Sequence, residues 1–333
     1  MTIINGIEID NIKIIKNEIK AAIQNNDMIE DNLHCIIVIS NPCQYAKRYI
    51  LAREFIKRFE LEQNVILYIV ELAYGNHNFY LTEKNNKQHL QLRANMDQVL
   101  WHKENMINLG VRYLLPKTWK AFAWIDADVE FENPCWASDT LKVLNGNSDI
   151  VQLFSHAIDM DNSMNAMSIY PSFGFQFIKE RPYTTGNANN FWHPGFAWAM
   201  TRKAYEKTGG LYESSILGSG DHNMAFSLMG KGRTSINQST TDGYKESIVE
   251  FEKKAYGLRL GYIPGVIRHY FHGSKKNRKY QERWQILVEN KYDPYVHVIQ
   301  NEFGLLIPSD ECPKKLLEMI MQYFKERNED ESI

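Results

Sequence analysis

The chain has 333 residues, of which 44% are hydrophobic and 23% charged, and a formal net charge of −2 at pH 7. This composition is typical of a globular protein, and the near-neutral balance argues against nucleic acid as a partner. No window approaches about 18 uncharged apolar residues, and the N-terminus is charged throughout. We therefore expect a cytoplasmic protein without a signal peptide or transmembrane segment.

In the first half of the chain, short apolar runs alternate with segments whose apolar residues recur at helical spacing. Isoleucines at helical spacing predict a helix within residues 10–30, and helical periodicity also covers residues 44–62 and 90–110. Short, β-branched apolar runs predict buried strands at 33–40, 64–72, 121–125 and 149–154. This alternation is typical of an α/β fold with a mixed, mainly parallel sheet flanked by helices.

The second half of the chain is less regular. Residues 155–195 are rich in Asn, Ser, Gly, Pro and aromatic side chains, which favours a lid or a binding loop. A helix is predicted behind the glycine-rich stretch 218–220, and residues 260–287 are typical of a strand, a basic turn and a helix. An amphipathic pattern predicts a last helix over residues 314–327.

Two aspartates follow one of the predicted strands, in "AFAWIDADVEFENP". In open parallel sheets ligands bind at the carboxyl ends of the strands, and residues i and i+2 of an extended chain point the same way. Asp126 and Asp128 together would suit Mg²⁺ or Mn²⁺ carrying phosphate oxygens. Asp159 and Asp161 repeat the pattern, but they stand among residues typical of a loop, so we favour the first pair.

The stretch "VIRHYFHGSKKNR" adds imidazoles and basic side chains. An imidazole beside carboxylates shifts the metal preference toward Mn²⁺, and the cluster of Lys275, Lys276 and Arg278 suits a diphosphate. The alternative is a solvated, charged turn with one packed histidine. Residues three apart on a strand face opposite ways, so we expect only one of His269 and His272 to bind metal, and we favour His272.

Two further groups of residues suggest a binding site. In "LGSGDHNMAF", Asp221 and His222 stand at the mouth of a predicted helix, and the glycines before them allow a ligand to approach the backbone closely. The alternative for Asp221 is a helix cap. Trp192 and His193 in the irregular segment could stack on a sugar, although aromatic side chains in loops more often pack locally.

In their order along the chain, these motifs resemble those of metal-dependent glycosyltransferases with the GT-A fold, over roughly residues 33–290. They are most similar to the group of β-1,4-galactosyltransferases, polypeptide N-acetylgalactosaminyltransferases and chondroitin-type transferases. The stretches that carry the resemblance are "IIVIS", "LYIVEL", "KENMINLG", "WIDADVEFEN", "HPGFAWAMTRKAYEKTGGL", "GSGDHN" and "IRHYFHGSKKN". The family has an acidic pair where this chain has Asp221 and His222, and its "IRH" pattern favours His269 as the metal ligand.

The resemblance implies a single GT-A (Rossmann-like) domain over residues 33–290. Residues 33–154 would form its nucleotide-sugar half and residues 155–290 its acceptor half. An N-terminal helical extension (1–32) and a C-terminal helical tail (291–333) would flank it.

The resemblance also implies roles for individual residues. Mn²⁺ or Mg²⁺ is expected on Asp126 and Asp128 with His272 or His269, and the catalytic base would be Asp221 or His222. Gly195 leads the acceptor strand, with Trp192 and His193 beside it as further candidates for substrate contact. The residues implied to contact the nucleotide sugar are Ser40, Glu71, Arg93, Lys103, Asp126 and Lys275.

The implied reaction transfers a sugar from UDP-hexose or UDP-N-acetylhexosamine to a hydroxyl group of a glycan, lipid or protein, with inversion at the anomeric carbon. A sugar-1-phosphate nucleotidyltransferase is the alternative among enzymes, but "SNPCQYAKR" lacks the glycine-rich loop that such enzymes usually carry after the first strand. A non-catalytic carbohydrate-binding protein is the second alternative, and it would not need a metal–diphosphate cluster.

Overall fold

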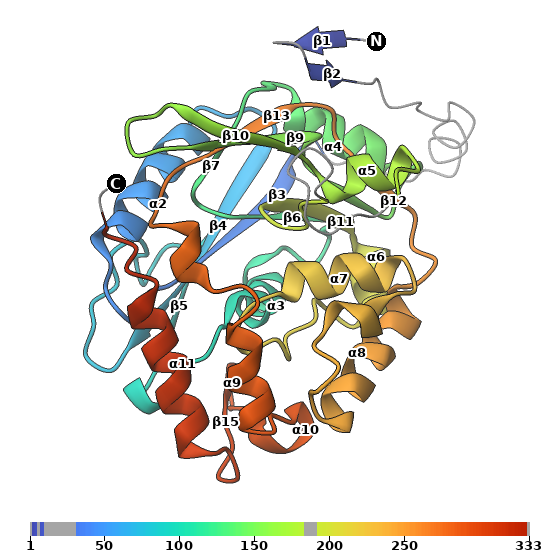
Figure 1. Cartoon of the computed structure of the whole chain (residues 1–333). Coiled ribbons are helices and arrows are strands. Elements are labelled where there is room, and N and C mark those ends of the chain that lie inside the picture. Colours follow the sequence, from blue (N-terminus) through green and yellow to red (C-terminus); the bar gives the residue numbers. More distant parts are fainter. Residues whose placement is uncertain (1, 5–6, 10–30, 183–191, 332–333) are drawn as a thin grey trace.

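The computed structural model describes residues 2–4, 7–9, 31–182 and 192–331 (Figure 1). Its largest sheet has the strand order β12-β8-β11-β6-β3-β4-β5. Within this sheet β11 pairs antiparallel with β6 and β8, and the other pairs are parallel. The strands are β3 (Leu33–Ser40), β4 (Val65–Tyr74), β5 (His89–Ala94), β6 (Ala121–Ile125), β8 (Ile150–Gln152), β11 (Ala197–Thr201) and β12 (Leu260–Tyr262). The predicted α/β fold with a mainly parallel sheet is confirmed.

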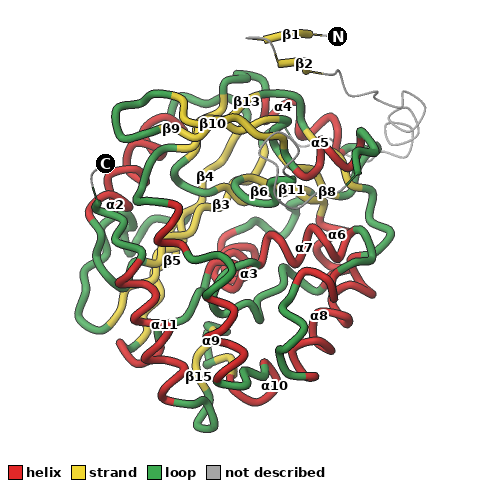
Figure 2. Tube along the Cα trace, viewed as in Figure 1, coloured by secondary structure: helices red, strands yellow, loops and turns green. Residues whose placement is uncertain are grey.

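Helices cover both faces of this sheet, which explains why all five residues of β6 are buried. Neighbouring residues of β3 enter different cores, because successive side chains of a strand point to opposite faces: Ile36 enters one, Cys35 and Ile37 the other. The first core includes residues of α3 (Lys103–Leu114), α6 (Arg202–Thr208), α7 (Gly220–Leu228), α8 (Asp242–Ala255), α9 (Arg283–Glu289) and α11 (Lys314–Glu326), which lie together in Figure 2. The second core includes α2 (Ala46–Phe59) and α4 (Trp136–Leu144).

A second sheet, of strand order β10-β9-β13-β7, packs against the second core. Its strands are β7 (Val129–Phe131), β9 (His156–Met160), β10 (Ala166–Pro171) and β13 (Val266–His269). Strand β9 pairs parallel with β13, which places Asp159 opposite His269 although 110 residues separate them. The second sheet therefore brings residues 156–159 of β9 next to residues 266–269 of β13.

Part of the segment 155–195, which we expected to be a loop, is regular structure. It contains β9, β10 and the short helix α5 (Phe173–Ile178), and residues 183–191 lie outside the described part. The expectation was wrong because β9 takes its backbone partners from β10 and β13, and a partner so far along the chain leaves no local periodicity.

The helix predicted over residues 90–110 is also corrected. Residues His89–Ala94 form β5, the edge strand that pairs with β4, and α3 begins only at Lys103 after a turn of 3₁₀-helix (Met96–Gln98). In β5, Leu92 and Ala94 are buried while Arg93 is exposed, the alternation of a strand rather than of a helix.

The two ends of the chain differ from the predicted helical extensions. The helix expected within residues 10–30 lies outside the described residues, and β1 (Thr2–Ile4) pairs antiparallel with β2 (Ile7–Ile9). The C-terminal segment contains α10 (Pro294–His297) and a hairpin of β14 (Val298–Gln300) and β15 (Leu306–Pro308) before the predicted helix, α11. In the described part of the chain no helix is long and apolar enough to cross a membrane.

Candidate functional site

Asp126 and Asp128 stand where the chain passes from β6 in the large sheet to β7 in the second sheet. Ala127 and Asp128 form a turn, and the backbone N–H of Asp126 still donates to the carbonyl of Phe196 (2.8 Å). Alternation of side chains holds only along an extended strand, so the two carboxylates do not share a direction here. Each takes a different set of partners.

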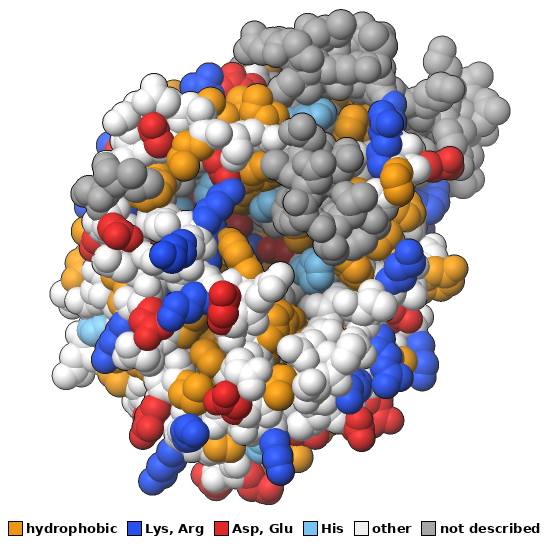
Figure 3. Space-filling model, viewed as in Figure 1, with side chains coloured by type: hydrophobic (Ala, Val, Ile, Leu, Met, Phe, Trp, Pro, Cys, Tyr) orange, Lys and Arg blue, Asp and Glu red, His pale blue; other side chains and the backbone are white. Residues whose placement is uncertain are grey.

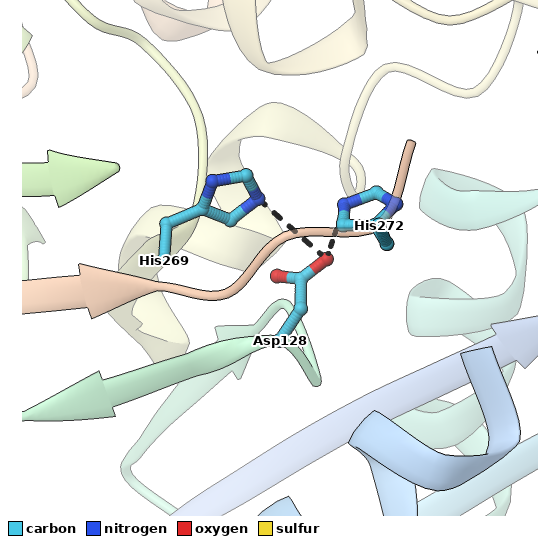
Figure 4. A group of neighbouring side chains, drawn as sticks. All are labelled: Asp128, His269 and His272. Carbon is cyan, nitrogen blue, oxygen red and sulfur yellow. Dashed lines mark ion pairs between the residues drawn. The ribbon is translucent and has the colours of Figure 1, made fainter. Parts of the chain in front are cut away.

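Asp128 faces two imidazoles, and we call these three residues the imidazole cluster. Its Oδ2 lies 2.9 Å from Nε2 of His272 and 3.9 Å from Nε2 of His269 (Figure 4). The three ligand atoms lie within 4.8 Å of one another. Strand β13 ends at His269 and the chain turns before His272, so both rings approach the same carboxylate. The prediction that the two histidines face opposite ways is wrong for this reason.

Asp159 of the second sheet holds His269 by a hydrogen bond. Nδ1 of His269 lies 2.8 Å from Oδ1 of Asp159, and Asp159 also accepts from the hydroxyl of Tyr170 (2.6 Å) and from Nζ of Lys275. Burial lowers the pKa of His269 and so favours the neutral ring. When Nδ1–H of His269 donates to Asp159, Nε2 carries the lone pair and faces Asp128, which is the tautomer that metal-binding histidines use.

The donor set fits a divalent metal. Burial would raise the pKa of Asp128, but His272, which lies 2.9 Å away, and the charge of Arg278 outweigh burial and keep the pKa below the usual range. Oδ1 of Asp128 is buried and has no hydrogen-bond partner among the described residues. Such an atom costs free energy unless a ligand satisfies it. One carboxylate and two imidazoles suit Mn²⁺ better than Mg²⁺, which prefers oxygen alone.

Asp126 belongs to a neighbouring group, which we call the lysine cluster: Lys103, Glu104, Asp126 and Asp221. Nζ of Lys103 lies 2.7 Å from Oδ1 of Asp126 and 2.8 Å from Oδ2 of Asp221. Burial and the charge of Asp221 raise the pKa of Glu104 to about 8. Its carboxyl lies against Gly220 at the start of α7, where a Cβ atom would come within 2.2 Å of Oε1. Only glycine fits this position.

A cavity of about 150 Å³ adjoins both clusters. Asp126, Asp128 and Lys103 line it, and so do Ser40 and Phe196. The described residues of its wall also include three arginines: Arg48, Arg278 and Arg327. Figure 3 shows a hollow in this face of the molecule, with acidic and basic side chains around it. The arrangement places positive charge beside candidate metal ligands, as a diphosphate would require.

Other residues predicted to contact the nucleotide have structural partners. Ser40 lines the cavity, and its hydroxyl bonds to that of Tyr74 (2.8 Å). Glu71 is buried, and its carboxylate accepts hydrogen bonds from the backbone N–H groups of residues 80–82. Arg93 donates to the carbonyl of His77 (3.0 Å), so Glu71 and Arg93 hold loops and are not among the described residues that line the cavity.

Of the residues predicted to contact the acceptor, His193 and Gly195 lie near the two clusters. His193 stacks on Phe196, with ring centroids 4.2 Å apart, and burial lowers its pKa to about 3. Trp192 is buried and packs edge-on against Phe173. Gly195 lies beside Asp221, since a Cβ atom there would be 3.8 Å from Oδ2 of Asp221, and the ring of His193 leaves little room for such an atom, with Cε1 only 3.0 Å away.

His222 packs against Phe226 in the same helix, with ring centroids 4.3 Å apart. Burial lowers the pKa of His222 to about 4, which keeps the ring neutral near pH 7. Of the two candidates for the base, Asp221 is the one that joins the lysine cluster.

Several site residues were missed from the sequence. Asp159 stood in the acidic pair that we did not favour, and only its pairing with β13 reveals its role. Its neighbour Asp161 instead caps a turn by accepting from the backbone N–H groups of Ser163 and Asn165 (both 2.8 Å). Arg48, Arg327, Glu104 and Glu329 carried no signal, because nothing in the residues around them differs from an ordinary charged helix or chain end.

No protein-family model and no curated protein sequence matches the chain significantly. The chain is similar to solved structures at low identity. A Desulfovibrio desulfuricans G20 protein, described as a candidate nucleotide-diphospho-sugar transferase, is 10% identical, with a TM-score of 0.32 over 72% of this chain and 82% of that one.

Two structures of Drosophila β-1,4-galactosyltransferase 7 are also similar. A mutant in complex with manganese, UDP-Gal and xylobiose is 11% identical, and the catalytic domain with xylobiose is 10% identical. Both have a TM-score of 0.39 over 87% of this chain and 98% of the other. With TM-scores below 0.5 the likeness is distant, so the function is inferred from the side chains of the site.

Proposed function

We propose that this chain is a metal-dependent glycosyltransferase that transfers a sugar from a UDP-linked donor to an acceptor hydroxyl group. The observation that carries the proposal is the convergence of Asp128, His269 and His272 beside a cavity lined by arginines. The cavity also lies beside the carboxyl end of β3, where Ser40 ends the strand, and open parallel sheets bind ligands at such ends.

Two groups of side chains in the cavity would bind a nucleotide diphosphate: the imidazole cluster through a metal, and the arginines directly. Asp128, His269 and His272 would hold a divalent metal, which would supply positive charge to offset the charge that develops on the diphosphate leaving group. Arg48, Arg278 and Arg327 line the same cavity and offer charge-assisted hydrogen bonds to the remaining oxygens.

Asp221 is the proposed general base. Its carboxylate accepts the proton of the acceptor hydroxyl as that oxygen bonds to the anomeric carbon, on the face opposite the departing diphosphate. The configuration at the anomeric carbon therefore inverts. Lys103 holds the carboxylate in place, and Gly195 lies beside it. A glycan, lipid or protein hydroxyl would satisfy this chemistry.

Nucleotide release tests the proposal. The protein is incubated with Mn²⁺ and a panel of UDP-, GDP- and CMP-sugars, with simple sugars as acceptors, and the freed nucleotide is quantified. We expect UDP from a UDP-hexose or a UDP-N-acetylhexosamine, and no release after chelation of the metal. Formation of pyrophosphate from UTP and a sugar 1-phosphate would instead identify a nucleotidyltransferase. Sugar binding without nucleotide binding would identify a carbohydrate-binding protein.

A further inference from the structure

The end of the C-terminal segment forms part of the wall of the cavity. Figure 1 shows the C-terminus beside α2, although some 280 residues separate them in the sequence. Glu329 is buried, with an exposed fraction of 2%. Its Oε1 accepts from Nη2 of Arg48 (2.9 Å) and from Nε of Arg327 (2.6 Å), and its Oε2 accepts from Nε of Arg48. Two of the cavity's arginines are thus bound to one carboxylate.

Further contacts fix this end of the chain. The carboxylate of Asp330 accepts from the backbone N–H groups of Ala46 (3.0 Å) and Lys47 (2.8 Å) at the start of α2. A Cβ atom on Gly273 would lie 3.0 Å from Cα of Glu329, so the loop after His272 packs directly on the segment. Oε2 of Glu329 lies 3.7 Å from Nδ1 of His272, which puts this carboxylate behind a candidate metal ligand.

The contacts of Glu329 explain why no arginine donates a hydrogen bond to Oδ1 of Asp128 among the described residues. Arg48 and Arg278 both lie close enough to interact electrostatically with its carboxylate, yet Oδ1 of Asp128 has no hydrogen-bond partner in the described part of the chain. Arg278 donates to His272 Nε2 (2.9 Å), and two nitrogens of Arg48 are taken by Glu329. Without Glu329, Arg48 would be a partly buried cation without its counter-ion, near the carboxylate of Asp128, whose Oδ1 has no hydrogen-bond partner among the described residues.

We propose that Glu329 is a positioning residue that holds Arg48 away from Asp128 and so keeps the imidazole cluster available for a divalent metal. The inference rests on the proposed function, since it assumes that this cluster binds metal. It makes residues 327–330 part of the metal site rather than an appended tail. A guanidinium on Asp128 would compete with the metal for the same oxygens.

Mn²⁺ binding without nucleotide, measured by electron paramagnetic resonance and calorimetry, tests the proposal. We expect Glu329→Gln to weaken Mn²⁺ binding at least about tenfold, as outer carboxylates of metal sites typically do. Glu329→Asp keeps the charge and should recover part of the affinity. Glu331→Gln is the matched control: Glu331 lies two residues away and accepts from Asn277 (2.9 Å), so Mn²⁺ affinity should stay within about threefold.

A double variant separates positioning from simple support of the fold. In Glu329→Gln with Arg48→Met, no guanidinium from α2 is left to occupy Asp128, so Mn²⁺ affinity should return to within about threefold of the unmodified protein. A double variant as weak as Glu329→Gln alone would contradict the proposal, and so would unchanged binding in Glu329→Gln. Failure of the unmodified protein to bind Mn²⁺ would instead contradict the proposed function.

Discussion

The lysine cluster and the imidazole cluster lie side by side, separated along the chain only by Ala127, yet they compensate their carboxylates in opposite ways. Asp126 and Asp221 share the ammonium of Lys103, a cation that the chain itself supplies. Asp128 faces two imidazoles, and burial lowers the pKa of one of them, His269, which favours its neutral ring. A carboxylate that already has a lysine partner suits positioning or proton transfer, whereas one that faces two imidazoles can bind a metal together with them.

The largest effect should separate the two members of the first acidic pair. Asp128→Asn removes the charged ligand, so Mn²⁺ affinity should fall by more than about 100-fold, beyond what outer-shell changes cause. Asp126→Asn should lower the same affinity by less than about tenfold, because Lys103 already offsets the charge of Asp126. Calorimetry on both folded variants measures the difference. Equal losses would show that Asp126 is also a ligand and that the clusters are one site.

A large effect on rate, without an effect on binding, is expected from the lysine cluster. Asp221→Asn keeps the shape of the side chain but removes its basicity, so sugar transfer should fall at least about 100-fold while UDP-sugar affinity stays within about threefold. His222→Gln should cost less, since His222 packs on Phe226. Normal transfer by Asp221→Asn together with an inactive His222→Gln would exchange the two roles. Full activity in both would favour a retaining mechanism.

The second acidic pair offers an intermediate effect. Asp159→Asn should weaken Mn²⁺ binding by about 10–100-fold, because the carboxylate that orients His269 is lost. Asp161→Asn should change it by less than about threefold, since Asp161 only caps a turn. Titration of both variants by electron paramagnetic resonance tests the contrast. Indistinguishable affinities would mean that Asp159 has no part in the metal site.

A smaller effect should appear in the pH dependence of stability, measured without metal. The folded-state pKa of Glu104, about 8, lies above its ordinary value of 4.5. Between these two values the folded state keeps a proton that the unfolded state has lost, so the free energy of unfolding decreases as pH rises. Glu104→Gln should remove this loss, so the variant should be close to the unmodified protein at pH 4.5 and exceed its free energy of unfolding by on the order of 4 kcal/mol at pH 9.

Denaturation with urea at both pH values measures the difference. Glu54, which forms an exposed ion pair with Lys57, provides a control. Glu54→Gln should shift the free energy of unfolding by the same amount at the two pH values. A constant difference across pH in Glu104→Gln would mean that Glu104 is ionised in the folded protein.

Local patterns were sufficient to predict much of the large sheet. The β-branched runs that became β3, β4, β6 and β8 are buried on both faces, so hydrophobicity alone revealed them. Strand β5 was mistaken for a helix because an edge strand of six residues merges with the helical pattern that follows it. Strands β9 and β10 were missed because their order depends on pairing with β13, far along the chain.

Motifs that carry their own chemistry pointed to Asp128, His269 and His272 in the sequence, but the approach of both imidazoles to one carboxylate was not predicted. It was not predictable where function depends on which charge lies next to which. Asp126 and Asp128 look equivalent in the sequence, and only the turn between β6 and β7 gives one to Lys103 and the other to the histidines. Glu329 shows the same limit, because its partner Arg48 lies at the opposite end of the chain.

Anomalous diffraction from crystals grown with Mn²⁺ and UDP tests the central claim most directly, because it locates the metal without reference to activity. The account predicts a single manganese peak coordinated by the carboxylate of Asp128 and Nε2 of His269 and His272, with diphosphate oxygens beside it. A peak between Asp126 and Asp221 in place of Lys103, or no manganese at the imidazole cluster in crystals that contain UDP, would contradict it.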